Sequence, residues 1–260
     1  MPYADLLESV VNVARRAGQV VMDCYDSGVV ARQKSDASPV TEADERAEAV
    51  ILAALALLTP DIPVVAEEQM AGAHDPVSAG ALGRFWLVDP LDGTREFISR
   101  NGEFTVNIAL IDQGEPVLGV VLAPALGRLF AGAANKGAFV EDAAVHGGSR
   151  LVIHARKVPP EGLTVVTSRS HGDAAALDSF LAGRRVAHLA NAGSSLKLCL
   201  VAAGEADLYP RLGRTMEWDI AAGHAVLGAA GGGVDTLAGV PMRYGKPGFE
   251  NPHFVASGSR

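Results

Sequence analysis

The sequence predicts a mixed fold in which a first half of the α+β type is followed by a second half of the α/β type. Residues 1–150 open with two amphipathic helical patterns and continue with short apolar runs separated by turn residues, which is typical of helices packed on an antiparallel sheet. Residues 151–260 instead alternate between strand-like and helix-like runs. We place a boundary between residues 145 and 160, and a length of 260 residues permits one large domain or two small ones.

The two N-terminal helices are predicted from apolar side chains that recur every three or four residues. The first covers residues 6–25, and its apolar residues share one face. The second begins at Thr41, which has the character of an N-cap residue with Asp44 three positions later, and it ends before Pro60.

Short apolar runs predict the strands of the first half. Residues 62–66 form a strand that leads directly into Glu67, and residues 70–83 are expected to be a loop. Residues 85–88 form a buried strand that ends at Asp89, because Pro90 should block its continuation. Four further runs predict an antiparallel meander, at residues 105–111, 117–122, 128–133 and 137–140.

The second half is predicted from the same two periodicities in alternation. Strands are expected at residues 163–167, 186–189, 206–209, 233–235 and 253–256. Helices are expected at residues 174–181, 194–203 and 220–230, the second of them ending at Gly204.

Composition excludes several classes of protein. The formal net charge is −8, only 5% of the residues are aromatic, and no Lys/Arg run is longer than a pair, so a nucleic-acid polymer is not an expected partner. No secretory leader or membrane-spanning run is recognisable. Cys24 and Cys199 lie in apolar helical patterns and are expected to be buried thiols in a reducing cytoplasm. Because the net charge of the chain is negative, an anionic substrate would need metal ions and local cations to neutralise it.

The turn from Asp89 to Thr94 is the first candidate site. Two carboxylates, Asp89 and Asp92, flank Pro90 and Leu91, and the Gly93-Thr94 pair follows with free backbone N–H groups. This arrangement suits a divalent cation beside a phosphate. A type I turn closed by Asp-Gly explains the same residues without any ligand, and the turn alone does not decide between the two.

Two further acids stand where a strand ends or a helix begins. Glu67 follows a predicted strand, and Asp219 opens a predicted helix. Together with Asp89 and Asp92 they could hold two or more hard cations such as Mg²⁺, which select oxygen ligands. Taken singly, Asp219 could merely favour a helix N-terminus and Glu67 could be solvated.

Three segments resemble the signature of the inositol monophosphatase-like metal phosphatases. They are Ala66-Glu67-Glu68, the run from Trp86 to Thr94, and the run from Glu217 to Gly223, which occur in the family's order and spacing. The resemblance covers essentially the whole chain and implies a layered αβαβα sandwich. It also implies that residues 1–150 carry most metal ligands and that residues 151–260 supply Asp219 and substrate contacts.

Within this superfamily the chain is most similar to bacterial 3′(2′),5′-bisphosphate nucleotidases of the CysQ type. The features that carry this resemblance are Lys34-Ser35-Asp36, Ser38 to Asp44, Thr94 to Phe97, Tyr209 to Gly213 and Ala222 to Leu227. Inositol monophosphatases more often have Thr-Asn-Phe after the Asp-Gly-Thr and an acidic residue near Arg211, so both departures point away from inositol.

The resemblance implies which residues bind metal. Glu67, Asp89 and the Leu91 carbonyl would hold one Mg²⁺, and Asp89, Asp92 and Asp219 a second. A third, weaker ion would be held through Glu67. Such ions activate a water and stabilise the leaving oxygen during in-line displacement.

The resemblance also implies the catalytic residues. Thr94, hydrogen-bonded to Asp44, would orient the attacking water together with Glu67, and the N–H groups of Gly93 and Thr94 would hold the phosphate. From the sequence alone Asp44 is better explained as the last residue of a capping box, and the two roles are not exclusive.

Substrate contacts are predicted less directly. Arg211 is the first candidate for a second phosphate, with Lys197 and Arg169 behind it, since cationic side chains suit phosphate oxygens. Each of the three could equally be a solvated surface cation. Asp219 and the pair Ser194-Ser195 are expected to touch substrate, although the serines could simply cap a helix.

The leading functional prediction is a Mg²⁺-dependent phosphomonoesterase that hydrolyses adenosine 3′,5′-bisphosphate, with its 5′-phosphosulfate analogue as a further substrate. The family implies inhibition by Li⁺ and a link to sulfate assimilation. An alternative is an inositol-1-phosphate, histidinol-phosphate or other sugar phosphatase. A third, non-enzymatic alternative is an inactive metal- or nucleotide-binding regulatory subunit. The sequence leaves a homodimer and a loose association with the inner membrane face open.

Overall fold

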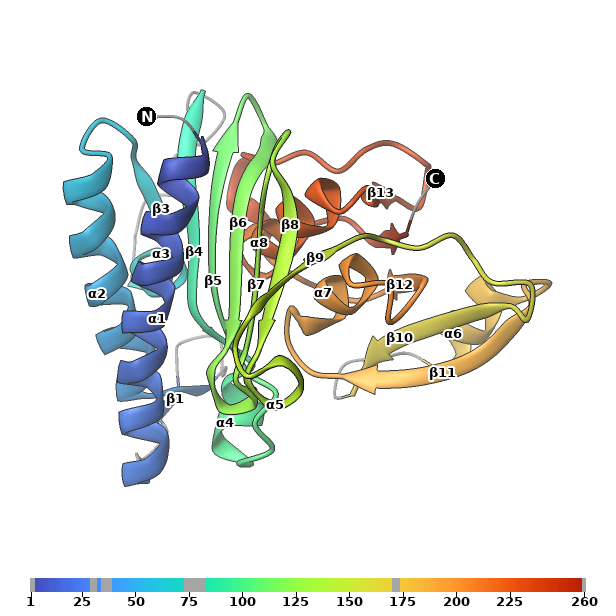
Figure 1. Ribbon diagram of the computed structural model, residues 1–260, viewed down its shortest axis with the longest axis horizontal. Helices are drawn as coiled ribbons and strands as arrows, with labels where there is room; N and C mark the ends of the chain where they lie inside the picture. Colours follow the sequence, from blue (N-terminus) through green and yellow to red (C-terminus); the bar gives the residue numbers. More distant parts are fainter. Residues whose placement is uncertain (1–2, 29–31, 34–38, 73–82, 170–173, 259–260) are drawn as a thin grey trace.

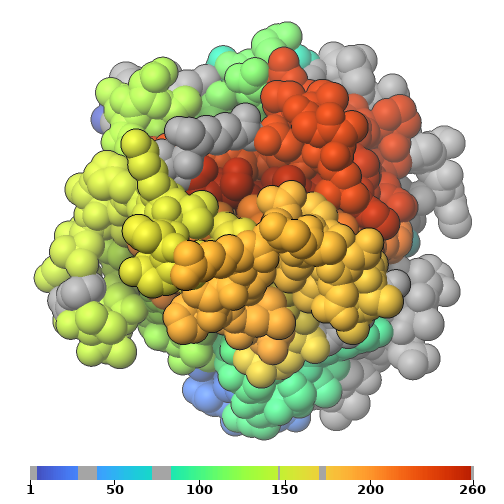
Figure 2. Space-filling model, turned by 90° about the vertical axis from the view of Figure 1, so that its right-hand side faces the viewer, coloured from blue at the N-terminus to red at the C-terminus, as the bar shows by residue number. Residues whose placement is uncertain are grey.

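The computed structural model describes residues 3–28, 32–33, 39–72, 83–169 and 174–258. Helices and two sheets form successive layers, as predicted (Figure 1). Figure 2 shows the molecule from the end that carries the second sheet, where the segments coloured gold, orange and red lie side by side. In the described part of the chain, no helix is both long and apolar enough to cross a lipid bilayer.

The first layer consists of α1 (Tyr3–Ser27) and α2 (Glu42–Leu58), as predicted. Both helices pack with their apolar faces on the larger sheet (Figure 1). The predicted capping box at the start of α2 is present, since the Thr41 amide donates to Asp44 Oδ2 at 2.8 Å. The motif at residues 34–36 and the central part of the loop predicted at 70–83 lie outside the described residues.

The larger sheet has seven strands. In spatial order they are β3 (Val64–Ala66), β4 (Arg84–Asp92), β5 (Thr105–Asp112), β6 (Glu115–Ala123), β7 (Arg128–Ala133), β8 (Gly137–Asp142) and β9 (Arg150–Ile153). The predicted antiparallel meander is confirmed, and β3 pairs with β4 in parallel. Side chains of β4 alternate between the two faces, with Trp86 toward α1 and α2 and Leu87 toward the other core.

The prediction that Pro90 ends its strand is wrong. Strand β4 continues to Asp92, and its pairing with β5 skips from Asp89 to Asp92. Because the bulge leaves Pro90 outside the hydrogen-bonded ladder, its missing N–H group costs nothing there. The bulge also brings Asp89 and Asp92 to the same end of the sheet.

The connections next to this sheet contain short elements. Strands β1 (Arg32–Gln33) and β2 (Pro39–Val40) pair across residues 34–38, and α3 (Glu67–Gly72) follows β3. Between β8 and β9 lies α5 (Ala143–His146), and a 3₁₀ turn, η2 (Pro124–Leu126), lies between β6 and β7. Since β9 pairs with β8, the first sheet extends beyond residue 150. The division into 1–150 and 151–260 stays a prediction.

The second half forms a five-stranded sheet and the helices beside it. In spatial order the strands are β11 (Val186–Ala192), β10 (Leu163–Ser168), β12 (Leu208–Arg211), β14 (Phe254–Ser257) and β13 (Gly233–Thr236). The helices are α6 (Ala174–Leu181), α7 (Leu196–Ala202) and α8 (Glu217–Ala229), and a 3₁₀ turn, η3 (Pro247–Phe249), precedes β14. All predicted helices and strands of this half are present, with ends shifted by up to three residues.

Helix α8 packs very close to the larger sheet because glycines face it. A Cβ atom on Gly119 of β6 would lie 2.3 Å from the Ala222 carbonyl oxygen, so only glycine fits there. On the other side of α8, a Cβ on Gly223 would lie 2.7 Å from Leu198 Cβ of α7. These contacts fix the start of α8, and with it Asp219, beside the end of β4.

We predict that Gly223→Ala lowers the free energy of unfolding by about 1–3 kcal/mol, because the new methyl group has no room between α7 and α8. Gly228→Ala in the same helix is the matched control, since it is exposed and a Cβ there meets no atom within 4 Å. That variant should be more stable by about 0.5–1 kcal/mol, from helix propensity. Urea unfolding curves of both variants measure this, and equal small effects would show that α8 is not tightly confined.

Candidate active site

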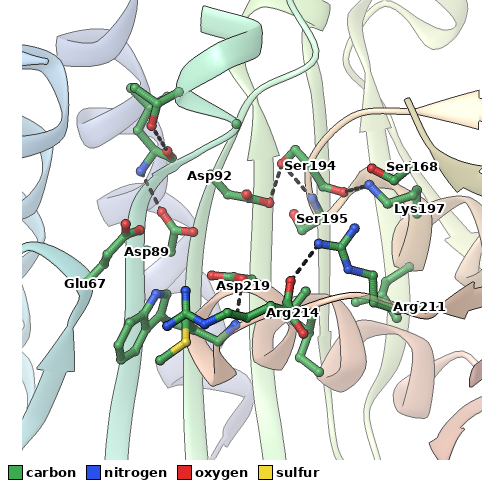
Figure 3. A pocket seen from close by; sticks show the side chains of 18 of the residues that line it. Glu67, Asp89, Asp92, Ser168, Ser194, Ser195, Lys197, Arg211, Arg214 and Asp219 are labelled. Carbon is green, nitrogen blue, oxygen red and sulfur yellow. Dashed lines mark hydrogen bonds between the residues drawn. The ribbon is translucent and has the colours of Figure 1, made fainter. Parts of the chain in front are cut away.

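A cavity of about 620 Å³ opens where β4, β12, α7 and α8 come together (Figure 3). Except for Asp44 and Arg169, every residue predicted to bind metal or substrate or to take part in catalysis lines it. These residues are Glu67, Asp89, Leu91, Asp92, Gly93, Thr94, Ser194, Ser195, Lys197, Arg211 and Asp219. The fold thus brings together residues from segments that are far apart in the sequence.

Four acidic side chains share one side of this cavity. Burial raises the pKa of Asp89 well above its usual range, and the nearby charges of Glu67, Asp92 and Asp219 raise it further. Burial, then Asp92 and Glu67, likewise raise the pKa of Asp219. Burial also raises the pKa of Asp92, although the hydrogen bond from Ser194 opposes the shift. The cluster is therefore a concentration of negative charge that Lys197 and Arg211 offset only in part.

One oxygen of each aspartate is oriented by the protein itself. Asp89 Oδ1 accepts a hydrogen bond from the Leu91 amide at 3.0 Å, and Asp219 Oδ2 from the Met216 amide at 2.8 Å. Asp92 Oδ2 accepts from the Ser194 hydroxyl at 2.7 Å. As these side chains stand, no three His, Cys, Asp or Glu groups among the described residues form a ready ligand set. Their chemistry nevertheless fits a hard divalent cation, which would relieve the repulsion that raises their pKa values.

The two carboxylate oxygens of Asp44 accept hydrogen bonds from two different residues, Thr41 and Thr94. Oδ2 accepts from the amide and the hydroxyl of Thr41, at 2.8 and 2.7 Å, and so caps α2. Oδ1 accepts from the Thr94 hydroxyl at 3.3 Å. Both interactions considered from the sequence are therefore present, and Asp44 reaches the cavity through Thr94.

The segment that carries Glu67 is held by a residue that sequence reasoning missed. Glu48 of α2 is 5% exposed, and its Oε2 accepts a hydrogen bond from the Glu68 amide at 2.8 Å. An acidic residue on the buried face of an amphipathic helix is the sequence signal that could have identified it. This bond ties α2 to the start of α3.

A buried polar network supports Asp92 from behind. Ser194 has a positive φ of 52°, and its hydroxyl contacts both Asp92 and Thr105. Ser195 is bonded to Thr105 at 2.8 Å and donates to the Asn107 side chain at 2.7 Å. Thr105 and Asn107 were missed, although two polar residues on one face of an otherwise apolar strand are a recognisable pattern. The alternative that Ser195 caps α7 with its side chain is wrong, because its hydroxyl is used in this network.

The predicted cations behave differently from one another. Lys197 is 3% exposed and donates to the carbonyls of Ala192 and Ser194, so the solvated alternative is wrong for it; burial lowers its pKa to about 8. Arg169 is paired with Glu103 at 2.8 Å. Arg211 lines the cavity and donates to the Arg214 carbonyl at 2.8 Å. The phosphate-binding role of Arg211 stays a prediction.

The chain matches the model of the inositol monophosphatase family over residues 3–256. It is 48% identical to the 3′(2′),5′-bisphosphate nucleotidase CysQ of Escherichia coli K12, over 97% of this chain and 99% of that protein. It is 32% identical to the protein of the same name from Haemophilus influenzae, over 98% and 93%.

Solved structures are similar over the same extent. The crystal structure of CysQ from Bacteroides thetaiotaomicron, a bacterial member of the inositol monophosphatase family, has a TM-score of 0.81 and 34% identity, covering 98% of each chain. An IMPase from Thermotoga maritima has a TM-score of 0.76 and 26% identity, covering 97% of this chain and 92% of that one. The predicted layered fold and the resemblance are both confirmed.

We predict that the protein without divalent cations loses stability as the pH rises from 5 to 8. The pKa values of Asp89 and Asp219 are raised in the folded state, so the unfolded chain ionises first and folding becomes less favourable above the ordinary carboxyl pKa of about 4. Added Mg²⁺ should raise the unfolding temperature more at pH 8 than at pH 5.

Thermal unfolding with EDTA or MgCl₂ measures this effect. Asp89→Asn should be more stable than the wild type without cations at pH 8, and should gain less from Mg²⁺. An unfolding temperature that responds equally to Mg²⁺ at both pH values would contradict a cation site at these acids.

Proposed function

The chain belongs to the inositol monophosphatase family, and from this premise we propose that it is a 3′(2′),5′-bisphosphate nucleotidase. It removes the 3′ phosphate of adenosine 3′,5′-bisphosphate and leaves adenosine 5′-monophosphate. The observation that carries the proposal is a single cavity with four acids together and with Arg211 and Arg214 also in its wall. Identity of 48% to bacterial nucleotidases of that name, over 97% of the chain, supports the choice of substrate.

The acids are the residues that would hold the cations. Glu67, Asp89 and the Leu91 carbonyl would bind one Mg²⁺ and Asp89, Asp92 and Asp219 a second, with a third, weaker ion through Glu67. When bound, such ions lower the pKa of a coordinated water and neutralise phosphate charge. Li⁺ is expected to inhibit by competing for one of these positions.

The chain's own residues orient the nucleophile. The Thr94 hydroxyl donates to Asp44 Oδ1, which leaves its lone pairs to accept a hydrogen bond from an attacking water. Glu67 is the base that takes the other proton of this water. The Gly93 and Thr94 amides stand at the start of α4 (Thr94–Ile98), where Gly93 has a positive φ of 89°, and are proposed to hold the phosphate oxygens.

The opposite end of the cavity is proposed to select the nucleotide. Arg211 is fixed by its bond to the Arg214 carbonyl and is proposed to face the phosphate that is retained. Ser194, Ser195 and Lys197 shape the wall through the network behind Asp92. The free, buried Cys24 and Cys199 suit a reducing cytoplasm, where this activity would serve sulfate assimilation.

Turnover of a panel of phosphomonoesters with Mg²⁺ tests the proposal. We expect kcat/KM to be highest for adenosine 3′,5′-bisphosphate, with its 5′-phosphosulfate analogue next. Faster turnover of inositol 1-phosphate or histidinol phosphate would assign the chain to another activity of the family. Binding without turnover of any member would indicate a regulatory subunit.

Thr94→Ala is expected to lower kcat by about 10²–10³-fold while KM changes little, because the positioned water is lost but the phosphate contacts remain. Thr94→Ser should recover most of the activity. Thr41→Ala is the matched control, since it removes the other partner of Asp44.

That control should lower the free energy of unfolding by about 1 kcal/mol through the lost helix cap and leave kcat near the wild-type value. If both variants change stability alone, Asp44 is only a capping residue, and the proposal that Thr94 and Asp44 orient the attacking water is wrong.

A further inference from the structure

Four cationic side chains line the cavity in the described part of the chain: Arg95, Lys197, Arg211 and Arg214. The ammonium group of Lys197 is buried and bonded to two carbonyls. The guanidinium of Arg211 donates to the Arg214 carbonyl. Arg95 lies on α4, beside the end that is proposed to hold the cleaved phosphate. The remaining cation, Arg214, was not predicted from the sequence.

The guanidinium of Arg214 is both exposed and weakly held. Its side chain is 65% exposed, and its Nε forms an ion pair with Glu250 Oε2 at 3.2 Å; the side chain of Glu250 is 57% exposed. An exposed ion pair of this kind contributes little stability. A phosphate offers the guanidinium two parallel charge-assisted hydrogen bonds and is therefore a stronger partner.

The backbones that carry this pair are fixed even though the side chains are exposed. The Arg214 carbonyl is bound by Arg211. Glu250 is paired with Met216 in an isolated β-bridge, and its neighbour Asn251 donates to the Met216 carbonyl at 2.7 Å.

Buried Glu217 holds the backbone shortly before Glu250, because its carboxylate accepts hydrogen bonds from the amides of Gly245 and Lys246, at 2.7 and 2.9 Å. The side chain of Arg214 can therefore change partner without any movement of the cavity wall.

We propose that Arg214 binds the phosphate that the substrate retains, and that Glu250 is a built-in competitor which occupies this guanidinium in the free enzyme. Figure 3 shows Arg211 bonded to the main-chain carbonyl of Arg214, so the two residues belong to the same part of the cavity wall. The inference rests on the proposed nucleotidase function and assigns its specificity to a residue pair. Glu250 does not line the cavity, and it acts only through Arg214.

The test compares adenosine 3′,5′-bisphosphate with adenosine 3′-monophosphate, which lacks the retained phosphate. Arg214→Gln should lower the ratio of kcat/KM for the bisphosphate to kcat/KM for the monophosphate about tenfold. The change should come mainly from a higher KM for the bisphosphate. Glu250→Gln should lower that KM by about threefold at low salt, and less at high salt. In the Arg214→Gln background the second change should have no effect, since its target is gone.

The pair Arg243–Glu115 provides the matched control. It is similarly exposed, 58% and 65%, joined at 2.7 Å, and neither residue lines the cavity. Arg243→Gln and Glu115→Gln should leave the substrate ratio unchanged, which separates a local contact from a general change in charge.

The outcomes distinguish the two proposals. If the wild type prefers the bisphosphate but Arg214→Gln leaves the ratio unchanged, the phosphate contact is wrong and the nucleotidase function stands. If Arg214→Gln slows both substrates equally, the arginine contacts the cleaved phosphate instead and the inference is overturned. A wild type without preference for the bisphosphate overturns the proposed function itself.

Discussion

The gathering of four acids on one side of the cavity is the constraint on which the rest of this structure depends. Asp89 is almost completely buried, and its charge is opposed by burial and by the acids around it. A fold gains nothing from such a cluster in the absence of a ligand, because buried like charges destabilise it. The close approach of α8 to the sheet, the bulge at Pro90 and the bond from Glu48 all hold these acids together nonetheless. The arrangement is explained by binding and not by stability.

Three acids of the site each have one carboxylate oxygen held by a backbone amide. Asp44 and Asp219 each use one oxygen to accept a backbone amide at the start of a helix, and Asp89 accepts the amide of Leu91 within a turn. Since one oxygen is fixed by the backbone, the carboxylate plane is fixed too, and the second oxygen is directed elsewhere. Local backbone amides thus orient these three acids, whereas Asp92 depends on the buried polar network behind it. This is why Asp44 makes both the capping contact with Thr41 and the contact with Thr94.

The parts that could be predicted from the sequence are those written in local patterns. The helices, the meander and the segments around Glu67, Asp92 and Asp219 follow from periodicity, turn residues and a family signature. The failures share one cause, which is dependence on distant partners. The strand continues through Pro90 because of its register with β5. Lys197 is buried because the folded loop presents carbonyls to it. Arg214 becomes a candidate only because the fold places it beside the cavity. A residue type at one position does not carry that information.

The two ends of the cavity differ in how freely their residues can be substituted. The acids are tied into β4, α3 and α8 by buried contacts, so altering one disturbs both packing and charge. The cationic end depends on the segment between β12 and α8 and on residue 250, where side chains are exposed and ion pairs are weak. We expect substitutions there to change which phosphate ester is held while leaving the acids in place. On the proposed function, specificity then follows from the exposed wall, whereas the reaction follows from the buried one.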